Sequence, residues 1–118
     1  MTPGSWNHRK YKRLHPENTF VINQQCVCRV FDFSQGGLSF GCTSEREIPD
    51  IMAIDIIDDS GLKIYSLPVE IIWAGKNKDI NTESIYKMIV GVKFNKKISY
   101  DQQAKLDQLT RLFKKDAS

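Results

Sequence analysis

The sequence lacks the residue combinations on which most catalytic and metal sites depend. It has only two histidines and three cysteines. Both histidines lie near the N-terminus, as His8 and His15. Cys26 and Cys28 are two residues apart, so on a strand they share a face, and a structural zinc site needs four ligands. No glycine-rich phosphate loop opens a helix. We therefore expect no enzyme activity, no metal and no cofactor.

Long apolar segments are also missing from this chain of 118 residues, a length that suits one domain. Residues 71–74 (IIWA) are among the longest apolar runs, far short of a bilayer span. The first residues, MTPGSWNHRKYKR, have no apolar stretch after their charges and so do not predict a secretory signal. An odd number of cysteines argues against a disulfide framework and favours a reducing environment. We expect a cytoplasmic protein.

Positive charge is concentrated near the N-terminus. The chain has a formal net charge of +3, from 17 basic and 14 acidic residues. Residues 1–16 contain no acidic residue and four basic ones, which are Arg9, Lys10, Lys12 and Arg13. The rest of the chain is nearly neutral, so the charge predicts a local anion site rather than a broad nucleic-acid surface. A solvated basic tail that only aids solubility is the alternative.

A series of short segments with strand character follows the basic residues. They are rich in β-branched and aromatic residues and lie at residues 19–22, 26–33, 38–40, 51–57, 62–73 and 84–94. Residues 58–61 (DDSG) predict a turn, and residues 74–83 a polar loop. Pro68 suggests a bulge or an edge position in its strand.

The segment at residues 26–41 predicts a hairpin-like unit. Residues 26–33 alternate, which places Val30 and Asp32 on one face and Phe33 on the other. Residues 34–37 (SQGG) predict a turn whose two glycines can adopt positive φ.

The last segment changes from strand to helix periodicity. Ser99 and Gln102 form an S-x-x-Q capping box, and an apolar face follows at Leu106, Leu109, Leu112 and Phe113. Six or so short antiparallel strands followed by one helix predict an all-β fold, a small β-barrel with one C-terminal helix packed on or beside it. The expected boundaries are a flexible tail at 1–8, an arm at 9–16, a barrel at 17–97 and a helix at 99–115.

Two fragments carry candidate binding chemistry. Arg9 and Arg13 form an R-x-x-x-R pair, and arginine suits bidentate recognition of phosphate and of guanine O6 and N7. The second fragment reads D-x-S-x-x-G and consists of Asp32, Ser34 and Gly37. Its carboxylate can accept hydrogen bonds from guanine, and its glycine lets the backbone approach a ligand. Taken alone, the D-x-S-x-x-G fragment is more simply interpreted as an ordinary turn between two strands.

Three further residues are secondary candidates for ligand contact: Lys10, Gly36 and Trp73. Trp73 ends a long strand, where its ring either closes one side of a site or belongs to the core or its rim.

The two fragments together, ahead of a run of strands, resemble the PilZ domain, the bacterial receptor module for the second messenger cyclic di-GMP (c-di-GMP). Residues 38–40 (LSF), 69–73 (VEIIW) and 91–94 (GVKF) also resemble PilZ segments. The similarity covers residues 9–113. It implies a six-stranded antiparallel β-barrel with one C-terminal helix (PilZ-like) that binds c-di-GMP, often as an intercalated dimer of the nucleotide.

The resemblance also implies roles for the two fragments. Arg9 and Arg13 would address phosphate and the Hoogsteen edge of guanine. Asp32, Ser34 and Gly37 would address a second guanine face. The domain would act in signal transduction, changing conformation on binding the nucleotide and signalling to an unidentified protein partner.

Two alternatives to a c-di-GMP receptor remain. One is a PilZ-like protein-interaction adaptor that does not bind nucleotide and serves pilus or flagellar function; such an adaptor is expected to have lost the two arginines. The other is a single-stranded nucleic-acid binder, which needs aromatic and basic residues spread over one sheet face. The localised charge disfavours the second alternative.

Overall fold

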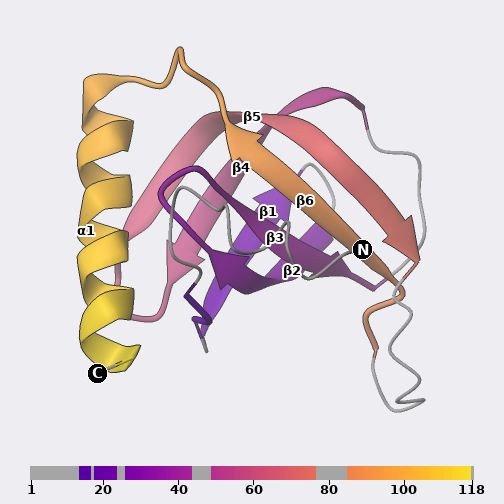
Figure 1. Ribbon diagram of the computed structural model, residues 1–118, viewed down its shortest axis with the longest axis horizontal. Coiled ribbons are helices and arrows are strands. Elements are labelled where there is room, and N and C mark those ends of the chain that lie inside the picture. Colours follow the sequence, from indigo (N-terminus) through magenta and orange to yellow (C-terminus); the bar gives the residue numbers. More distant parts are fainter. Residues whose placement is uncertain (1–13, 17, 24–25, 44–48, 77–84, 118) are drawn as a thin grey trace, which may run out of the picture.

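The computed structural model describes residues 14–16, 18–23, 26–43, 49–76 and 85–117 (Figure 1). These ranges form six strands and one helix: β1 (Thr19–Asn23), β2 (Cys26–Phe33), β3 (Gly37–Cys42), β4 (Ile51–Asp58), β5 (Lys63–Lys76), β6 (Met88–Phe94) and α1 (Tyr100–Ala117). All neighbouring strands are antiparallel and close into a barrel in the order β1-β2-β3-β6-β5-β4. The predicted six-stranded antiparallel barrel with one C-terminal helix is confirmed.

The hydrophobic core fills the barrel and extends to the helix beside it. Alternate strand residues, such as Leu38 and Phe40 on β3, are buried in the interior, because successive side chains of a strand point to opposite faces. Helix α1 adds Leu109 and Phe113 to the same cluster. The rings of Phe33 and Phe113 meet edge to face with centroids 5.1 Å apart, so the end of β2 is packed against the helix.

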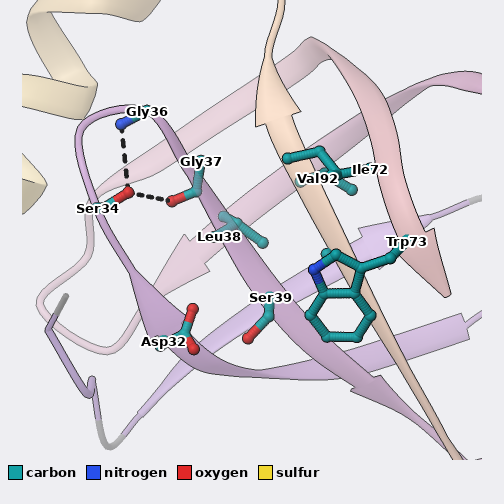
Figure 2. Close-up of a pocket in the computed structure, with 10 residues that line it drawn as sticks. Asp32, Ser34, Gly36, Gly37, Leu38, Ser39, Ile72, Trp73 and Val92 are labelled. Carbon is teal, nitrogen blue, oxygen red and sulfur yellow. Dashed lines mark hydrogen bonds between the residues drawn. The ribbon is translucent and has the colours of Figure 1, made fainter. Parts of the chain in front are cut away.

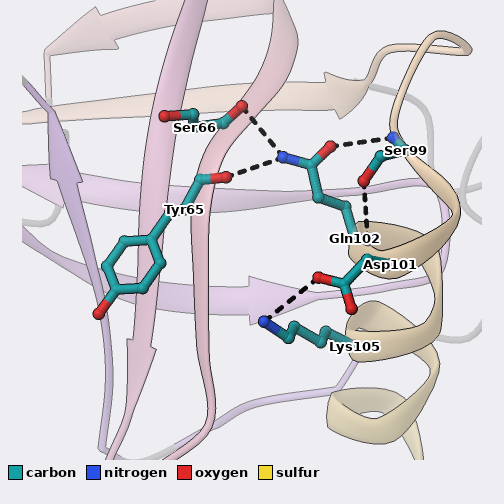
Figure 3. Close-up of polar contacts among 6 residues, drawn as sticks. All are labelled: Tyr65, Ser66, Ser99, Asp101, Gln102 and Lys105. Carbon is teal, nitrogen blue, oxygen red and sulfur yellow. Dashed lines mark hydrogen bonds and ion pairs between the residues drawn. The ribbon is translucent and has the colours of Figure 1, made fainter.

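The predicted capping box at the start of α1 is confirmed (Figure 3). The Ser99 hydroxyl accepts from the Gln102 backbone N–H at 3.1 Å, and the Gln102 side-chain oxygen accepts from the Ser99 N–H at 3.0 Å. The amide nitrogen of Gln102 then donates to the carbonyl oxygens of Tyr65 and Ser66, at 2.8 and 3.1 Å. One side chain therefore caps the helix and attaches it to β5.

Those two carbonyl groups are available because β5 bulges at Tyr65 and Ser66. Ile54 pairs with Leu67 but Ile56 pairs with Ile64, so β5 has one extra residue here. Ser66 has φ of 52°. The Ser66 N–H donates to Asp55 Oδ1 at 2.8 Å. The bulge expected at Pro68 thus lies just before it, and Pro68 itself pairs with Ala53 in the ladder.

Two further expectations differ from the structure. Residues 74–76, predicted as loop, continue β5, because its pairing with β6 extends to Lys76 opposite Met88. Leu112 was expected on the buried face of the helix, but 37% of it is exposed. It lies on the flank of α1 that faces the β4–β5 turn, where a groove of about 610 Å³ separates the two elements.

Candidate functional site

A bulge in β2 sets the direction of Asp32. Val30 pairs with Phe40 and Asp32 pairs with Ser39, so Phe31 is an extra residue in β2. Val30 and Phe33 are both fully buried. The expected alternation, which put Asp32 on the face of Val30, is therefore wrong: a bulge re-aims the residues that follow it. The half-buried Asp32 carboxylate lies beside Ser39 at the pocket (Figure 2).

Hydrogen bonds within residues 34–37 hold the turn after β2. The Ser34 N–H donates to the Gly37 carbonyl at 2.8 Å. The Ser34 hydroxyl also donates to that carbonyl, at 3.2 Å, and accepts from the Gly36 N–H at 3.3 Å (Figure 2). The Gly36 carbonyl accepts from Phe94 of β6 at 3.0 Å. Ser34 therefore braces the turn that shapes the pocket.

Gly37 is required for a different reason from the one expected. Neither glycine of the turn has positive φ; among the glycines that the structure describes, only Gly61 does. A Cβ on Gly37 would overlap the Val92 carbonyl oxygen and lie 2.9 Å from the Lys93 Cα, both backbone atoms of β6. The glycine thus permits β3 and β6 to approach closely.

A second bulge orients the aromatic wall of the site. Ile71 pairs with Val92 and Trp73 pairs with Gly91, so Ile72 is an extra residue in β5. The indole of Trp73 lies over Gly91, where a Cβ would overlap ring atoms. Figure 2 shows this ring on the side of the pocket across from Asp32. Trp73 is 46% exposed, which identifies it as a wall residue rather than a core aromatic.

These elements enclose a pocket of about 150 Å³. Its lining includes five residues predicted from the sequence, which are Asp32, Ser34, Gly36, Gly37 and Trp73. Sites that enclose drug-sized ligands measure about 300–1,000 Å³. The pocket thus has room for one part of a larger ligand. The other predicted site residues, Arg9, Lys10 and Arg13, lie outside the described residues, as does the predicted tail at 1–8.

Sequence reasoning missed five residues of the pocket lining: Leu38, Ser39, Ile72, Gly91 and Val92. Ser39 lies between the core residues Leu38 and Phe40 and therefore points to the outer face of the barrel. The sequence signal for these pocket residues was the presence of small residues at outward-facing strand positions, because small residues leave space under neighbouring aromatic rings. Finding them required the strand register, which the sequence alone does not provide.

Leu14 ties the chain just after the R-x-x-x-R fragment to the end of β2. Leu14 and Phe33 form an antiparallel bridge with two hydrogen bonds, N–H to carbonyl in both directions, each 2.8 Å long. Leu14 is 3% exposed and belongs to the core cluster. Leu14, the sixth residue of the predicted arm at 9–16, is therefore part of the hydrophobic core.

One ion pair lies next to the pocket. Lys93 of β6 pairs in register with pocket residue Gly37 on one side and with Glu70 of β5 on the other. Lys93 Nζ lies 3.1 Å from Glu70 Oε2, and both side chains are substantially exposed. A cation and an anion therefore stand side by side near the pocket.

Other kinds of site find no support in the described part of the chain. There, no group of three or more His, Cys, Asp and Glu side chains is placed to hold a metal ion. None of its helices is both long and apolar enough to cross a membrane.

Comparisons with known proteins agree with the barrel. The model of the PilZ domain family matches residues 7–112. The PilZ domain of YcgR from Escherichia coli, with c-di-GMP, is 16% identical with a TM-score of 0.73, over 93% of this chain and 94% of that chain. YcgR in complex with c-di-GMP is also 16% identical, with a TM-score of 0.67, over 93% of this chain and 47% of that one.

An uncharacterised Legionella protein, Lpg0364, has the same fold. It is 16% identical with a TM-score of 0.63, over 92% of this chain and 100% of that chain. A comparison with curated protein sequences gave no match.

Proposed function

The chain belongs to the PilZ domain family, and we propose that it is a c-di-GMP receptor that changes conformation on binding and signals to a protein partner. The structures of the YcgR PilZ domain with c-di-GMP and of YcgR in complex with c-di-GMP support the nucleotide as ligand. PilZ domains serve as receptors or adaptors, which is consistent with a protein that works by binding rather than by catalysis.

The observation that carries the proposal is the Leu14–Phe33 bridge. Phe33 lies between Asp32 and Ser34, and Leu14 follows Arg13 directly in the sequence. Leu14 therefore fixes, beside the D-x-S-x-x-G turn, the point to which the R-x-x-x-R fragment is covalently attached. Two motifs that are distant in the sequence can therefore act on one ligand.

The pocket supplies complementary chemistry for a guanine base. The Asp32 carboxylate can accept from the N1–H and N2–H₂ donors of guanine, and hydrogen bonds to charged groups are the stronger ones. Across the pocket, the exposed indole of Trp73 offers an apolar face for a base. Ser34 would act indirectly, by holding the turn in shape, because its hydroxyl already forms hydrogen bonds within the turn. Arg9 and Arg13 would hold phosphate and the Hoogsteen edge from outside the pocket.

The conformational change would occur in the residues before Leu14. Arg9, Lys10, Lys12 and Arg13 are four like charges close together in sequence, and an anion would neutralise their mutual repulsion. Leu14 is already fixed in the core, so ordering would spread outward from it. A partner would then meet a surface that differs between the ligand-bound and ligand-free forms.

Titration calorimetry with c-di-GMP, cyclic di-AMP and GTP tests the proposal. We expect heat of binding with c-di-GMP and much weaker binding of the other two, because the site would contact both the phosphodiester groups and the guanine edges of the ligand. Equal binding of all three would show a general anion site. No binding of c-di-GMP would instead favour the adaptor that works by protein contact.

Hydrogen exchange tests the conformational change separately. Exchange at residues 5–13 should slow when c-di-GMP is added, with smaller changes at residues 32–37. Binding without any slowing at residues 5–13 would leave the receptor assignment in place and contradict the ordering of the arm.

A further inference from the structure

Two thiols face each other inside the barrel, away from the proposed ligand site. Cys28 of β2 and Cys42 of β3 are 0% and 1% exposed, and their Sγ atoms lie 3.4 Å apart. Both are present as thiols rather than as a disulfide. Neither has a part in the proposed binding of nucleotide.

The strand register places the two cysteines opposite each other. Arg29 pairs with Gly41, so the antiparallel ladder puts Cys28 across from Cys42. Directly opposite residues have Cβ atoms about 4.5–5.5 Å apart, with the closer values in non-hydrogen-bonded pairs. A disulfide needs about 3.5–4.5 Å. A small approach of the two strands is therefore enough to join them.

We propose that Cys28 and Cys42 form a reversible redox site that hydrogen peroxide oxidises to an intramolecular disulfide. One thiolate attacks a peroxide oxygen, the O–O bond breaks, and a sulfenic acid and hydroxide form; the hydroxide takes up the proton that the thiol released and leaves as water. The second thiol then attacks the sulfenic sulfur, so that the S–S bond forms and a second water leaves. The two thiols lose two protons and two electrons in total, and peroxide is reduced to two waters.

The position of the pair in the barrel allows this reaction despite its burial. Buried thiols are generally inert, so oxidation requires local opening. Cys42 is the last residue of β3, and Cys28 lies close to the first residue of β2. Strand ends open at lower free-energy cost than the middle of a barrel, which gives peroxide access without global unfolding.

The disulfide should be easy to reduce. Linking directly opposed residues pulls the strands together, and deviations from ideal disulfide geometry store strain that makes the bond more reducible. The same β2–β3 hairpin carries Asp32 and the turn at residues 34–37. Oxidation thus adds a covalent constraint to the element that forms one wall of the pocket.

Thiol counting in a Cys26→Ser variant tests the proposal, because Cys28 and Cys42 are then the only cysteines. The folded variant is exposed to a slight excess of hydrogen peroxide, quenched, unfolded in urea and labelled with a maleimide. We expect both thiols to be lost together while the protein stays monomeric on a non-reducing gel. Reduced glutathione should restore both.

Two matched variants, Cys26→Ser with Cys28→Ala and Cys26→Ser with Cys42→Ala, retain one buried thiol each. Circular dichroism confirms that they are folded; oxidation of their single thiol should stop at the sulfenic acid, which dimedone labels, whereas the variant with both thiols should end as a disulfide, which dimedone does not label. Equal dimedone labelling of the variant with both thiols would show oxidation without pairing and overturn the proposal. So would thiols that persist in the folded protein but pair when it is oxidised in urea, or a disulfide that glutathione leaves intact.

Discussion

The indole of Trp73 occupies the space that a side chain at position 91 would need. Gly91 lies across from Trp73 in the β5–β6 ladder, and a Cβ there would overlap the ring. The aromatic wall of the pocket therefore depends on two features: the absence of a side chain at position 91 of β6, and the bulge at Ile72 of β5.

Replacing Gly91 with alanine should displace that ring. We expect the affinity for c-di-GMP to fall by about 1–3 kcal/mol, the range measured for aromatic–base stacking. The free energy of unfolding should fall by about 1–3 kcal/mol from overpacking. The emission of Trp73, measured in a Trp6→Phe background, should shift because the ring leaves Gly91.

Gly75→Ala is the matched control for that experiment. Gly75 lies on the same strand as Trp73, and an added Cβ there meets no atom within 4 Å. Both the fluorescence and the affinity should be unchanged. If Gly91→Ala behaves like Gly75→Ala, the ring can move aside without consequence and is not part of the site.

Asp32 should contribute an acceptor oxygen more than a charge. Asp32→Ala is expected to weaken c-di-GMP binding by about 1.5–3 kcal/mol, the scale of a hydrogen bond to a charged group. Asp32→Asn keeps the shape and one acceptor oxygen, so it should retain most of the affinity. Calorimetry on both, with thermal unfolding to confirm the fold, separates these cases. Equal losses in two folded variants would show that the carboxylate charge is essential.

Arg9 and Arg13 should each add a charge-assisted contact. Arg9→Ala and Arg13→Ala are expected to weaken c-di-GMP binding by about 1.5–3 kcal/mol each. Lys12→Ala removes the same charge outside the R-x-x-x-R spacing and should cost much less. Thermal unfolding should barely change in any of the three. A collapse of the melting temperature in Arg13→Ala would identify that arginine as structural.

Much of the fold was predictable because its signals are local. Alternation marked the strands, and the capping box at Ser99 and Gln102 marked the helix start within one residue. The end of β5 was missed because residues 74–76 are held by pairing with β6, a contact that composition does not encode. The exposure of Leu112 likewise depends on where the β4–β5 turn lies relative to the helix.

The candidate site was predictable only in part. The motif residues Asp32, Ser34 and Gly37 do meet at one pocket, because a turn keeps near neighbours together. The direction of Asp32 was not predictable, because the bulge at Phe31 depends on the register between two strands. Ser39 reaches the pocket through the same register, without any motif to mark it.

The two residues of the ion pair near the pocket, Lys93 and Glu70, should influence the affinity for c-di-GMP in opposite directions. A ligand phosphate would compete with Glu70 for the Lys93 ammonium. Lys93→Gln should therefore weaken c-di-GMP binding, and Glu70→Gln should strengthen it, each by about 0.2–1 kcal/mol, the scale of exposed pairs. Both effects should shrink as salt is added.

The pair formed by Lys105 and Asp101 on α1 provides the control. It is also exposed, with Nζ and Oδ2 3.3 Å apart, but it lies on the helix and not in the pocket. Lys105→Gln and Asp101→Asn make the same charge changes. If these variants alter affinity as much as those at Lys93 and Glu70, the effect reflects net charge and not position.

Gln102 should matter for stability and not for binding, because it joins the helix to β5 and none of its hydrogen-bond partners is a predicted ligand contact. Gln102→Ala removes the cap on Ser99 and both bonds to the bulge, so the free energy of unfolding should fall by about 1–3 kcal/mol. Gln103→Ala is the control, since the Gln103 amide donates to Asp107 within the helix.

Gln102→Glu separates the two roles of this side chain. A glutamate still accepts from the Ser99 N–H and completes the capping box, but it cannot donate to the carbonyl oxygens of Tyr65 and Ser66. Its carboxylate would instead face those oxygens. Chemical denaturation should therefore show Gln102→Glu to be destabilised at neutral pH despite an intact cap. Wild-type stability in Gln102→Glu would mean that capping alone accounts for Gln102, and that the core contacts of Leu109 and Phe113 suffice to hold the helix on the barrel.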